Sequence, residues 1–118
     1  MSRARALGTS GEEAAAAYLR KKKYRVISRG FRFHRGEIDI IAYDGDILVF
    51  VEVKTRRSAA FGPPEESVTP LKQRQIRKLA EVYLMLNNLG DTACRFDILS
   101  LISDDRQGYR IHHIRDAF

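Results

Sequence analysis

The chain has little cysteine, no long apolar run and a deficit of acidic charge, and each shortage excludes a class of protein. A single cysteine, Cys94, excludes an internal disulfide and a zinc site built from cysteines. Its place ahead of an apolar segment predicts a small buried residue. No apolar run approaches the ~20 residues of a membrane span. The basic N-terminus also lacks the apolar stretch of a signal peptide. We therefore expect a cytoplasmic protein that does not associate with membranes.

The charge balance favours a polyanionic partner. Lys and Arg number 21 against 15 Asp and Glu, which gives a net charge of +6 and a pI near 9.8. A small basic domain commonly binds DNA or another nucleic acid, although a solubilising surface is the plainer alternative. The 118 residues suffice for one domain, 1–118, whose residues 1–8 we expect to form a flexible basic arm.

The order of elements predicts an α/β fold. Ser10 would cap a first helix, and Thr69-Pro70 would begin a second that ends in Asn87-Asn88. Alternating or apolar segments predict five strands. The expected helices are 11–22 and 70–86, and the expected strands are 24–33, 37–43, 47–54, 95–102 and 109–114. Residues 56–67 predict a loop at the rim of any site. The order α-β-β-β-α-β-β predicts a central mixed sheet.

Charged residues interrupt two of these strands. Glu52 and Lys54 close an apolar run, and Glu37 and Asp39 alternate with isoleucines. Residues two apart on a strand share a face, and buried charges are costly unless they are paired or bound to a metal. The pattern therefore indicates a site, with a solvated sheet face as the alternative.

The turn between these strands predicts their register. If Asp44-Gly45 is a two-residue hairpin loop, Glu37 lies opposite Glu52, and Asp39 lies diagonal to Glu52, roughly 7–8 Å away. One cation would span that gap. Leu48 and Phe50 share the face and predict that it is covered.

A further acid lies on the first helix. Glu12 shares a helical stripe with Ala15, Ala16 and Leu19, which directs it toward the core. It is either part of the site or an acid that favours the start of the helix.

These residues resemble the PD-(D/E)XK nuclease superfamily and, within it, the YraN-like bacterial family related to archaeal Holliday-junction resolvases. The matching segments run over nearly the whole chain. They are Gly11-Glu12-x-x-Ala15, Gly36-Glu37-Ile38-Asp39, Phe50-Val51-Glu52-Val53-Lys54-x-Arg56, Phe61-Gly62, Lys72-Gln73, Arg95-Phe96-Asp97 and Ile114-x-x-Ala117-Phe118. One departure is Ile38, which stands where the superfamily's name places proline.

The resemblance implies a restriction-endonuclease-like, three-layer fold. It also implies that Asp39 and Glu52 bind the metal, that Lys54 is the catalytic lysine and that Glu12 belongs to the site. A resolvase-like protein is expected to be a homodimer, because two cuts need two sites.

The expected reaction is metal-dependent hydrolysis of phosphodiester bonds. Mg²⁺ (or Mn²⁺) held by Asp39, Glu52 and the carbonyl of Val53 would activate water and polarise the phosphate. Lys54 would stabilise developing charge. Glu37 is either a further ligand or the partner of a basic residue.

Further basic and polar residues flank this group and are candidate contacts to DNA phosphates. They are Arg56, Arg57, Lys72 and Gln73. The sequence thus predicts a Mg²⁺-dependent endonuclease acting on DNA, including branched DNA. The alternatives are a non-catalytic nucleic-acid-binding module and a protein-interaction domain. The spacing of the three histidines indicates no zinc site.

Overall fold

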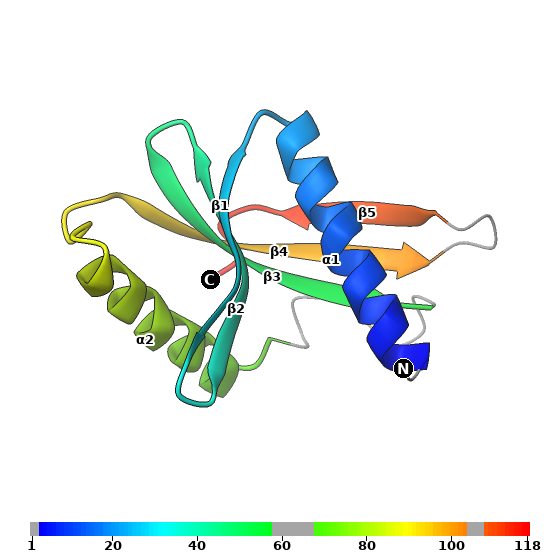
Figure 1. Ribbon diagram of the computed structural model, residues 1–118, viewed down its shortest axis with the longest axis horizontal. Coiled ribbons are helices and arrows are strands. Elements are labelled where there is room, and N and C mark those ends of the chain that lie inside the picture. Colours follow the sequence, from blue (N-terminus) through cyan, green and yellow to red (C-terminus); the bar gives the residue numbers. More distant parts are fainter. Residues whose placement is uncertain (1–2, 58–67, 104–107) are drawn as a thin grey trace.

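The computed structural model describes residues 3–57, 68–103 and 108–118, with side chains from residue 10 onward. It confirms the predicted order of elements (Figure 1). These are α1 (Arg3–Lys21), β1 (Arg25–Phe33), β2 (Gly36–Asp44), β3 (Ile47–Arg56), α2 (Pro70–Leu86), β4 (Cys94–Ser103) and β5 (Tyr109–Ile114).

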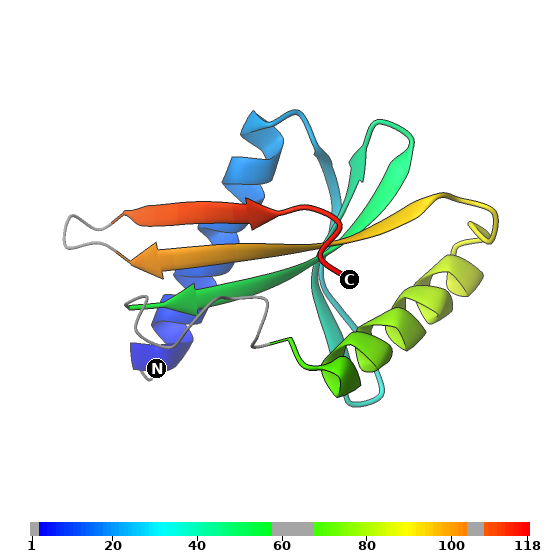
Figure 2. The same ribbon diagram turned by 180° about the vertical axis from the view of Figure 1, so that it is seen from behind.

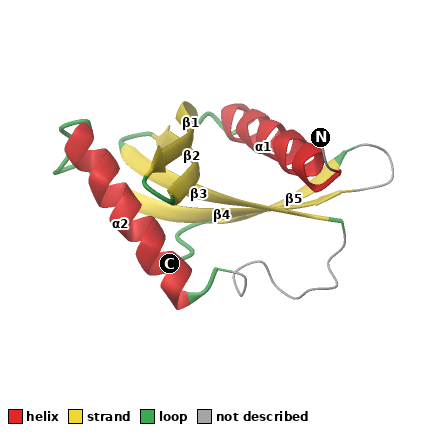
Figure 3. Ribbon diagram, turned by 60° about the horizontal axis from the view of Figure 1, so that its bottom comes forward, coloured by secondary structure: helices red, strands yellow, loops and turns green. Residues whose placement is uncertain are grey.

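The strands form one mixed sheet with a helix on each side. They lie in the order β1-β2-β3-β4-β5, and β3 and β4 pair in parallel while the other neighbours are antiparallel. Helix α1 lies in front of β3–β5 in Figure 1 and behind them in Figure 2. Figure 3 shows the two helices on opposite sides of the sheet. The fold is therefore an α/β/α arrangement of three layers.

Each helix buries an apolar stripe against its own face of the sheet. Ala15, Ala16 and Leu19 of α1 pack with Ile40 and Val51, whereas the apolar stripe of α2 packs against Leu48, Phe50 and Phe96. Leu48 and Phe50 are 0% and 1% exposed, which confirms the predicted cover on their face. Because both faces are buried, a charge on the central strands needs a paired partner or a position near an end of the sheet.

The two helices begin differently from one another. Helix α1 starts at Arg3 rather than Gly11, so Ser10 lies inside it and the predicted cap is wrong. Propensity cannot separate an inner serine from a capping one when the preceding residues also tolerate a helix. Helix α2 begins as predicted, with the Thr69 hydroxyl accepting a hydrogen bond from the Lys72 N–H at 3.2 Å.

The hairpin register differs from the prediction by two residues. Asp44 pairs with Ile47 and Ile40 with Val51, so the loop is Gly45-Asp46 rather than Asp44-Gly45. Gly45 has φ +59°, and a glycine with positive φ at the first loop position suits a tight hairpin turn. A two-residue shift keeps every side chain on its expected face. It also replaces the predicted Glu37–Glu52 pairing, because the observed register, if continued, sets Asp39 opposite Glu52.

The sheet forks where β2 leaves β3. Pairing between these strands ends at Ile40 and Val51, while β1 still pairs with β2 as far as Gly36 and β3 with β4 as far as Arg56. In Figure 1, β2 descends while β3 runs to the right. Backbone groups inside the fork need partners other than the neighbouring strand.

Two glycines allow the helices to pack closely against the strands beside the fork. A Cβ on Gly11 of α1 would overlap the Thr55 side chain of β3, and one on Gly36 of β2 would lie 2.6 Å from Leu79 Cδ1 of α2. Neither position has a positive φ, so the requirement is for space. These contacts bring the residue after Gly11, Glu12, beside the fork.

Three smaller predictions have mixed outcomes. Cys94 is exposed rather than buried, and its thiol donates to the Thr92 carbonyl at 3.3 Å. Most of the predicted 56–67 loop, with Phe61-Gly62, and most of the turn before β5 lie outside the described residues. Within the described ranges, neither helix is long and apolar enough to cross a membrane.

The Gly11 contact gives a test of this packing. Gly11→Ala is expected to lower the free energy of unfolding by about 1–3 kcal/mol, because the added methyl meets Thr55 in a packed interface. Urea denaturation would measure the loss. Thr55→Ala combined with Gly11→Ala should recover part of it, and Gly90→Ala, which meets no atom within 4 Å, serves as the control. A Gly11→Ala protein as stable as the parent would contradict the contact.

Candidate metal centre

Three carboxylates from two different elements meet in the fork. Glu12 of α1 joins Glu37 and Asp39 of β2, and one oxygen from each lies within 4.8 Å of the others. All three residues are half-buried. The helical stripe directed Glu12 toward the core, and the structure sets its carboxylate beside those of Glu37 and Asp39, while its chemical role stays a prediction.

Asp39 is held at the point where the strands part. Its Oδ2 accepts a hydrogen bond from the Val53 N–H of β3 at 2.8 Å. Burial, followed by the neighbouring charge of Glu52, raises the pKa of Asp39 from 3.8 to about 7. Glu12 and Glu37 raise this pKa further, against the opposing Val53 hydrogen bond. Near neutral pH this carboxyl is therefore divided between its protonated and ionised forms.

Glu52 lies beside this triad and is paired with lysines. Its side chain is 8% exposed, and its Oε1 lies 3.4 Å from Lys54 Nζ and 3.8 Å from Lys72 Nζ. Lys54 comes from the same strand and Lys72 from the first turn of α2. A cavity of about 310 Å³ opens here, lined among others by Glu37, Asp39, Glu52 and Lys72. The structure thus brings together the acids and the lysine that the sequence selected.

The other predicted site residues lie around this centre. Arg56 ends β3 opposite Ile102 of β4, and Arg57 follows it on the surface. Lys72 lies beside the acids, with Nζ 3.8 Å from Glu52 Oε1, and its contact to phosphate stays a prediction. The Gln73 amide donates to the Val68 carbonyl at 3.0 Å, which ties it to the start of α2. Val53 contacts Asp39 through its N–H, while its carbonyl stays a predicted ligand.

The donor set suits a hard divalent cation. Mg²⁺ and Mn²⁺ favour carboxylate oxygens, and two oxygens bound at about 2.1 Å lie at most about 4.2 Å apart. The three oxygens of the triad all lie within 4.8 Å of one another, close to the span of one such ion. A cation would also relieve the repulsion that raises the Asp39 pKa. The triad can therefore bind a metal.

Sequence reasoning missed a second polar cluster around Asp97. This carboxylate is 0% exposed and accepts hydrogen bonds from Arg95 Nε at 2.9 Å, His113 Nε2 at 2.7 Å and the Asp116 N–H at 3.0 Å. Burial raises its pKa, but these bonds outweigh burial and lower the pKa to about 2. Asp97 stood in a matched motif, yet its partner on β5 is 16 residues away. No spacing in the sequence indicated their contact.

Comparison with known proteins places the chain in a family. By its fold and its acids, the protein is an α/β/α domain with an acidic centre in a forked sheet. Residues 11–101 match the uncharacterised protein family UPF0102, and the chain belongs to this family.

Three relatives show the extent of the likeness. A UPF0102 protein of Geotalea uraniireducens is 50% identical over 97% of this chain and 90% of its own length. UPF0102 protein GSU0650 of Geobacter sulfurreducens is 50% identical over 95% and 88%. UPF0102 protein CT2262 of Chlorobaculum tepidum is 47% identical over 95% and 91%. Their names assign no activity.

The raised pKa of Asp39 predicts a pH effect on stability. Between pH 4 and 7 the unfolded chain loses this proton before the folded chain does, so the free energy of unfolding should fall as pH rises. Asp39→Asn removes the titration and should exceed the parent by about 2 kcal/mol at pH 8, a value reduced for partial exposure. Urea denaturation in EDTA at pH 4.5, 6 and 8 would measure the difference. Asp91→Asn, at an exposed site, is the control, and parallel profiles for parent and Asp39→Asn would refute the shift.

Metal binding should stabilise the fold by linkage. At one hundred times its dissociation constant, Mg²⁺ or Mn²⁺ is expected to add about 2.7 kcal/mol to the free energy of unfolding. The gain should grow between pH 6 and 8, because the cation competes with the Asp39 proton. Asp39→Asn should lose most of it, and Glu81→Gln, an exposed change on α2, should keep it. Equal responses in parent and Asp39→Asn would show that the triad is not the metal site.

Proposed function

We propose that this protein is a divalent-metal-dependent endonuclease that hydrolyses phosphodiester bonds in DNA, branched DNA included. The observation that supports this most is the gathering of Glu12, Glu37 and Asp39 beside a buried Glu52 that two lysines contact. Neighbouring carboxylates that are partly removed from water repel one another and lower the stability of the fold. A protein that only binds phosphates gains nothing from acids at its contact surface. The likeness of the motifs to the PD-(D/E)XK nucleases points to the same chemistry.

The metal would belong to the acidic triad and its neighbour. Glu12, Glu37 and Asp39 would hold Mg²⁺ or Mn²⁺, with Glu52 close by. When bound, the ion would supply an acidified water and a Lewis acid for the phosphate. The Val53 N–H keeps Asp39 directed into the fork, so that its carboxylate is already positioned before the metal enters.

The lysines would act on the charge that develops at phosphorus. Lys54 Nζ is held 3.4 Å from Glu52 Oε1, which fixes an ammonium group beside the acids. Lys72 Nζ, which comes from helix α2, lies 3.8 Å from the same Glu52 oxygen. An ammonium group at this position would stabilise the negative charge of the transition state. We assign this stabilising role to Lys54, and we assign the positioning of the DNA backbone to Lys72.

Basic residues at the rim would bind the DNA backbone. Arg57 is exposed directly after β3, and Arg35 lines the same cavity as Asp39. Arg56 lies at the end of the strand that carries Lys54. These side chains surround the acids with positive charge, which would draw a polyanion to an otherwise repulsive site. The proposed homodimer would place two such sites on one branched substrate.

Cleavage and binding should separate by substitution. With Mg²⁺ or Mn²⁺, the parent is expected to cut labelled DNA, and EDTA should stop it. Asp39→Asn or Glu52→Gln should abolish cutting while DNA affinity holds or rises, because negative charge is removed. Lys54→Ala should slow cutting by about 100-fold. Gel assays with four-way, linear and single-stranded DNA would measure cutting and binding by the parent and by each variant. Asp91→Asn is the control.

A change at the rim should act on binding alone. Arg57→Ala should weaken DNA binding and reduce the salt slope by about 0.9, the share of one phosphate contact. Arg110→Ala on β5 is the matched control. A parent that binds DNA with a steep salt slope but cuts no substrate would replace the nuclease with a non-catalytic binding module. If the parent neither binds nor cuts DNA, the remaining alternative is a protein-interaction domain.

A further inference from the structure

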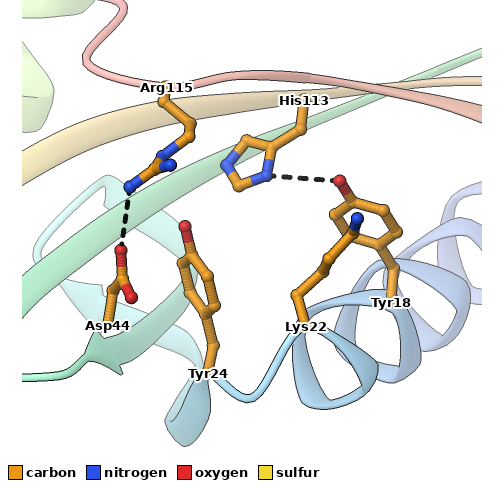
Figure 4. A pocket seen from close by; sticks show the side chains of 6 residues that line it. All are labelled: Tyr18, Lys22, Tyr24, Asp44, His113 and Arg115. Atoms are coloured by element: carbon orange, nitrogen blue, oxygen red, sulfur yellow. Dashed lines mark hydrogen bonds and ion pairs between the residues drawn. The ribbon is translucent and has the colours of Figure 1, made fainter.

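A second cavity lies at the hairpin end of β2, away from the acidic triad. It has a volume of about 380 Å³ and is lined by Tyr18, Lys22, Tyr24, Asp44, His113 and Arg115. At about 3.4 Å per residue, the five-residue step from Asp39 to Asp44 separates the two places by about 17 Å. Figure 4 shows these side chains converging from α1, the start of β1, the end of β2 and the C-terminal segment.

The floor of this cavity is a fully bonded polar network. His113 donates or shares a proton with the buried Asp97 through Nε2 at 2.7 Å, and its Nδ1 lies 3.4 Å from the Tyr18 hydroxyl. Arg95 bonds Asp97 and also donates to the Tyr24 hydroxyl at 2.7 Å. The rings of Tyr18, Tyr24 and His113 are thereby held in place without a ligand.

The walls of the cavity carry an excess of positive charge and of donors. Lys22 and Arg115 line the cavity with Asp44, and the charge of Arg95 beneath them is matched by Asp97, which leaves one positive charge when His113 is counted as neutral. Asp44 is already occupied, because Arg95 lies 2.9 Å and Arg115 3.1 Å from its Oδ2.

The ligand-facing groups keep some freedom. The side chain of Arg115 is 62% exposed, and Lys22 is also exposed, so both can turn toward an anion. Burial raises the pKa of Tyr24, so its hydroxyl stays protonated, and next to the hydrogen bond from Arg95 its own hydrogen bond helps to lower the pKa of Asp44.

The cavity also presents flat rings. Tyr18 and Tyr24 each meet the His113 ring edge-on, with centroids 5.7 and 5.8 Å apart. Lys22 Nζ lies 5.7 Å from the centroid of the Tyr18 ring. Figure 4 shows the lysine nitrogen in front of that ring. Aromatic faces beside cationic groups suit a base next to a phosphate. The volume falls in the range of small-ligand sites and exceeds what a bare ion needs.

We infer that this cavity binds a nucleotide, with its phosphate between Lys22 and Arg115 and its base against Tyr18 or Tyr24. Arginine's planar fork and the lysine ammonium form charge-assisted hydrogen bonds with phosphate oxygens. Asp44 pairs with Arg115 in the free protein and keeps this guanidinium at the mouth. The site is independent of the proposed nuclease centre and needs no metal.

Calorimetric titration of the full chain in EDTA tests this inference with adenosine monophosphate, adenosine and inorganic phosphate. The monophosphate should bind more tightly than phosphate, and adenosine should bind least. Lys22→Ala and Arg115→Ala should each weaken binding of the monophosphate by about tenfold or more, the share of one charged hydrogen bond. Both residues are exposed, so the variants should fold.

The controls remove the same charges outside the cavity. Lys21→Ala on α1 and Arg110→Ala on β5 should leave the affinity unchanged. Amide NMR shifts on adding the monophosphate should centre on Tyr24 and Arg115. Equal weakening by the controls, equal binding of adenosine, phosphate bound as tightly as the monophosphate, or shifts centred elsewhere would each overturn the inference. A terminally phosphorylated oligonucleotide that outcompetes its unphosphorylated form would identify a strand end as the source of the nucleotide.

Discussion

The hydrogen bond from the Val53 N–H to Asp39 is the interaction on which the centre depends. It forms where β2 separates from β3, so a side chain replaces the backbone partner that the neighbouring strand no longer supplies. This replacement fills the fork with a carboxylate and fixes its direction. Glu12 can join because Gly11 lets α1 lie against β3. In a regular sheet without the fork, there would be no space for Glu12 of α1 to lie beside the acids of β2.

Two aspartates in this fold experience opposite environments. Asp97 is fully buried, yet its pKa falls to about 2, because an arginine, a histidine and a backbone amide all donate to it. Asp39 is half-buried, and its pKa rises to about 7, because burial raises the pKa and three neighbouring acids add to this against a single donor. Burial alone therefore does not set the charge state. The donors around Asp97 suit a structural anchor, whereas the shortage of donors around Asp39 suits a ligand that has still to bind.

The Asp97 network also explains several matched motif residues far from the acids. Arg95 and Asp97 tie β4 to β5 and to the segment that follows it. Phe96 stacks on Phe118 at 5.1 Å, and the Ala117 N–H donates to the Phe96 carbonyl at 2.7 Å. These contacts hold the C-terminus against the sheet. A motif shared across a family thus serves packing here as well as any chemistry.

The sequence by itself determined the order of elements, the cap of α2 and the acids that face one another, because period-two alternation and turn residues act locally. It grouped Glu37, Asp39 and Glu52, since a register error of two residues leaves every face unchanged, whereas Glu12 joined them only through the family resemblance. The fork in the sheet and the contact of Lys72 from α2 with Glu52 became evident only from the folded chain. It alone also joined Asp97 to His113. These features depend on contacts between elements, which no local pattern encodes.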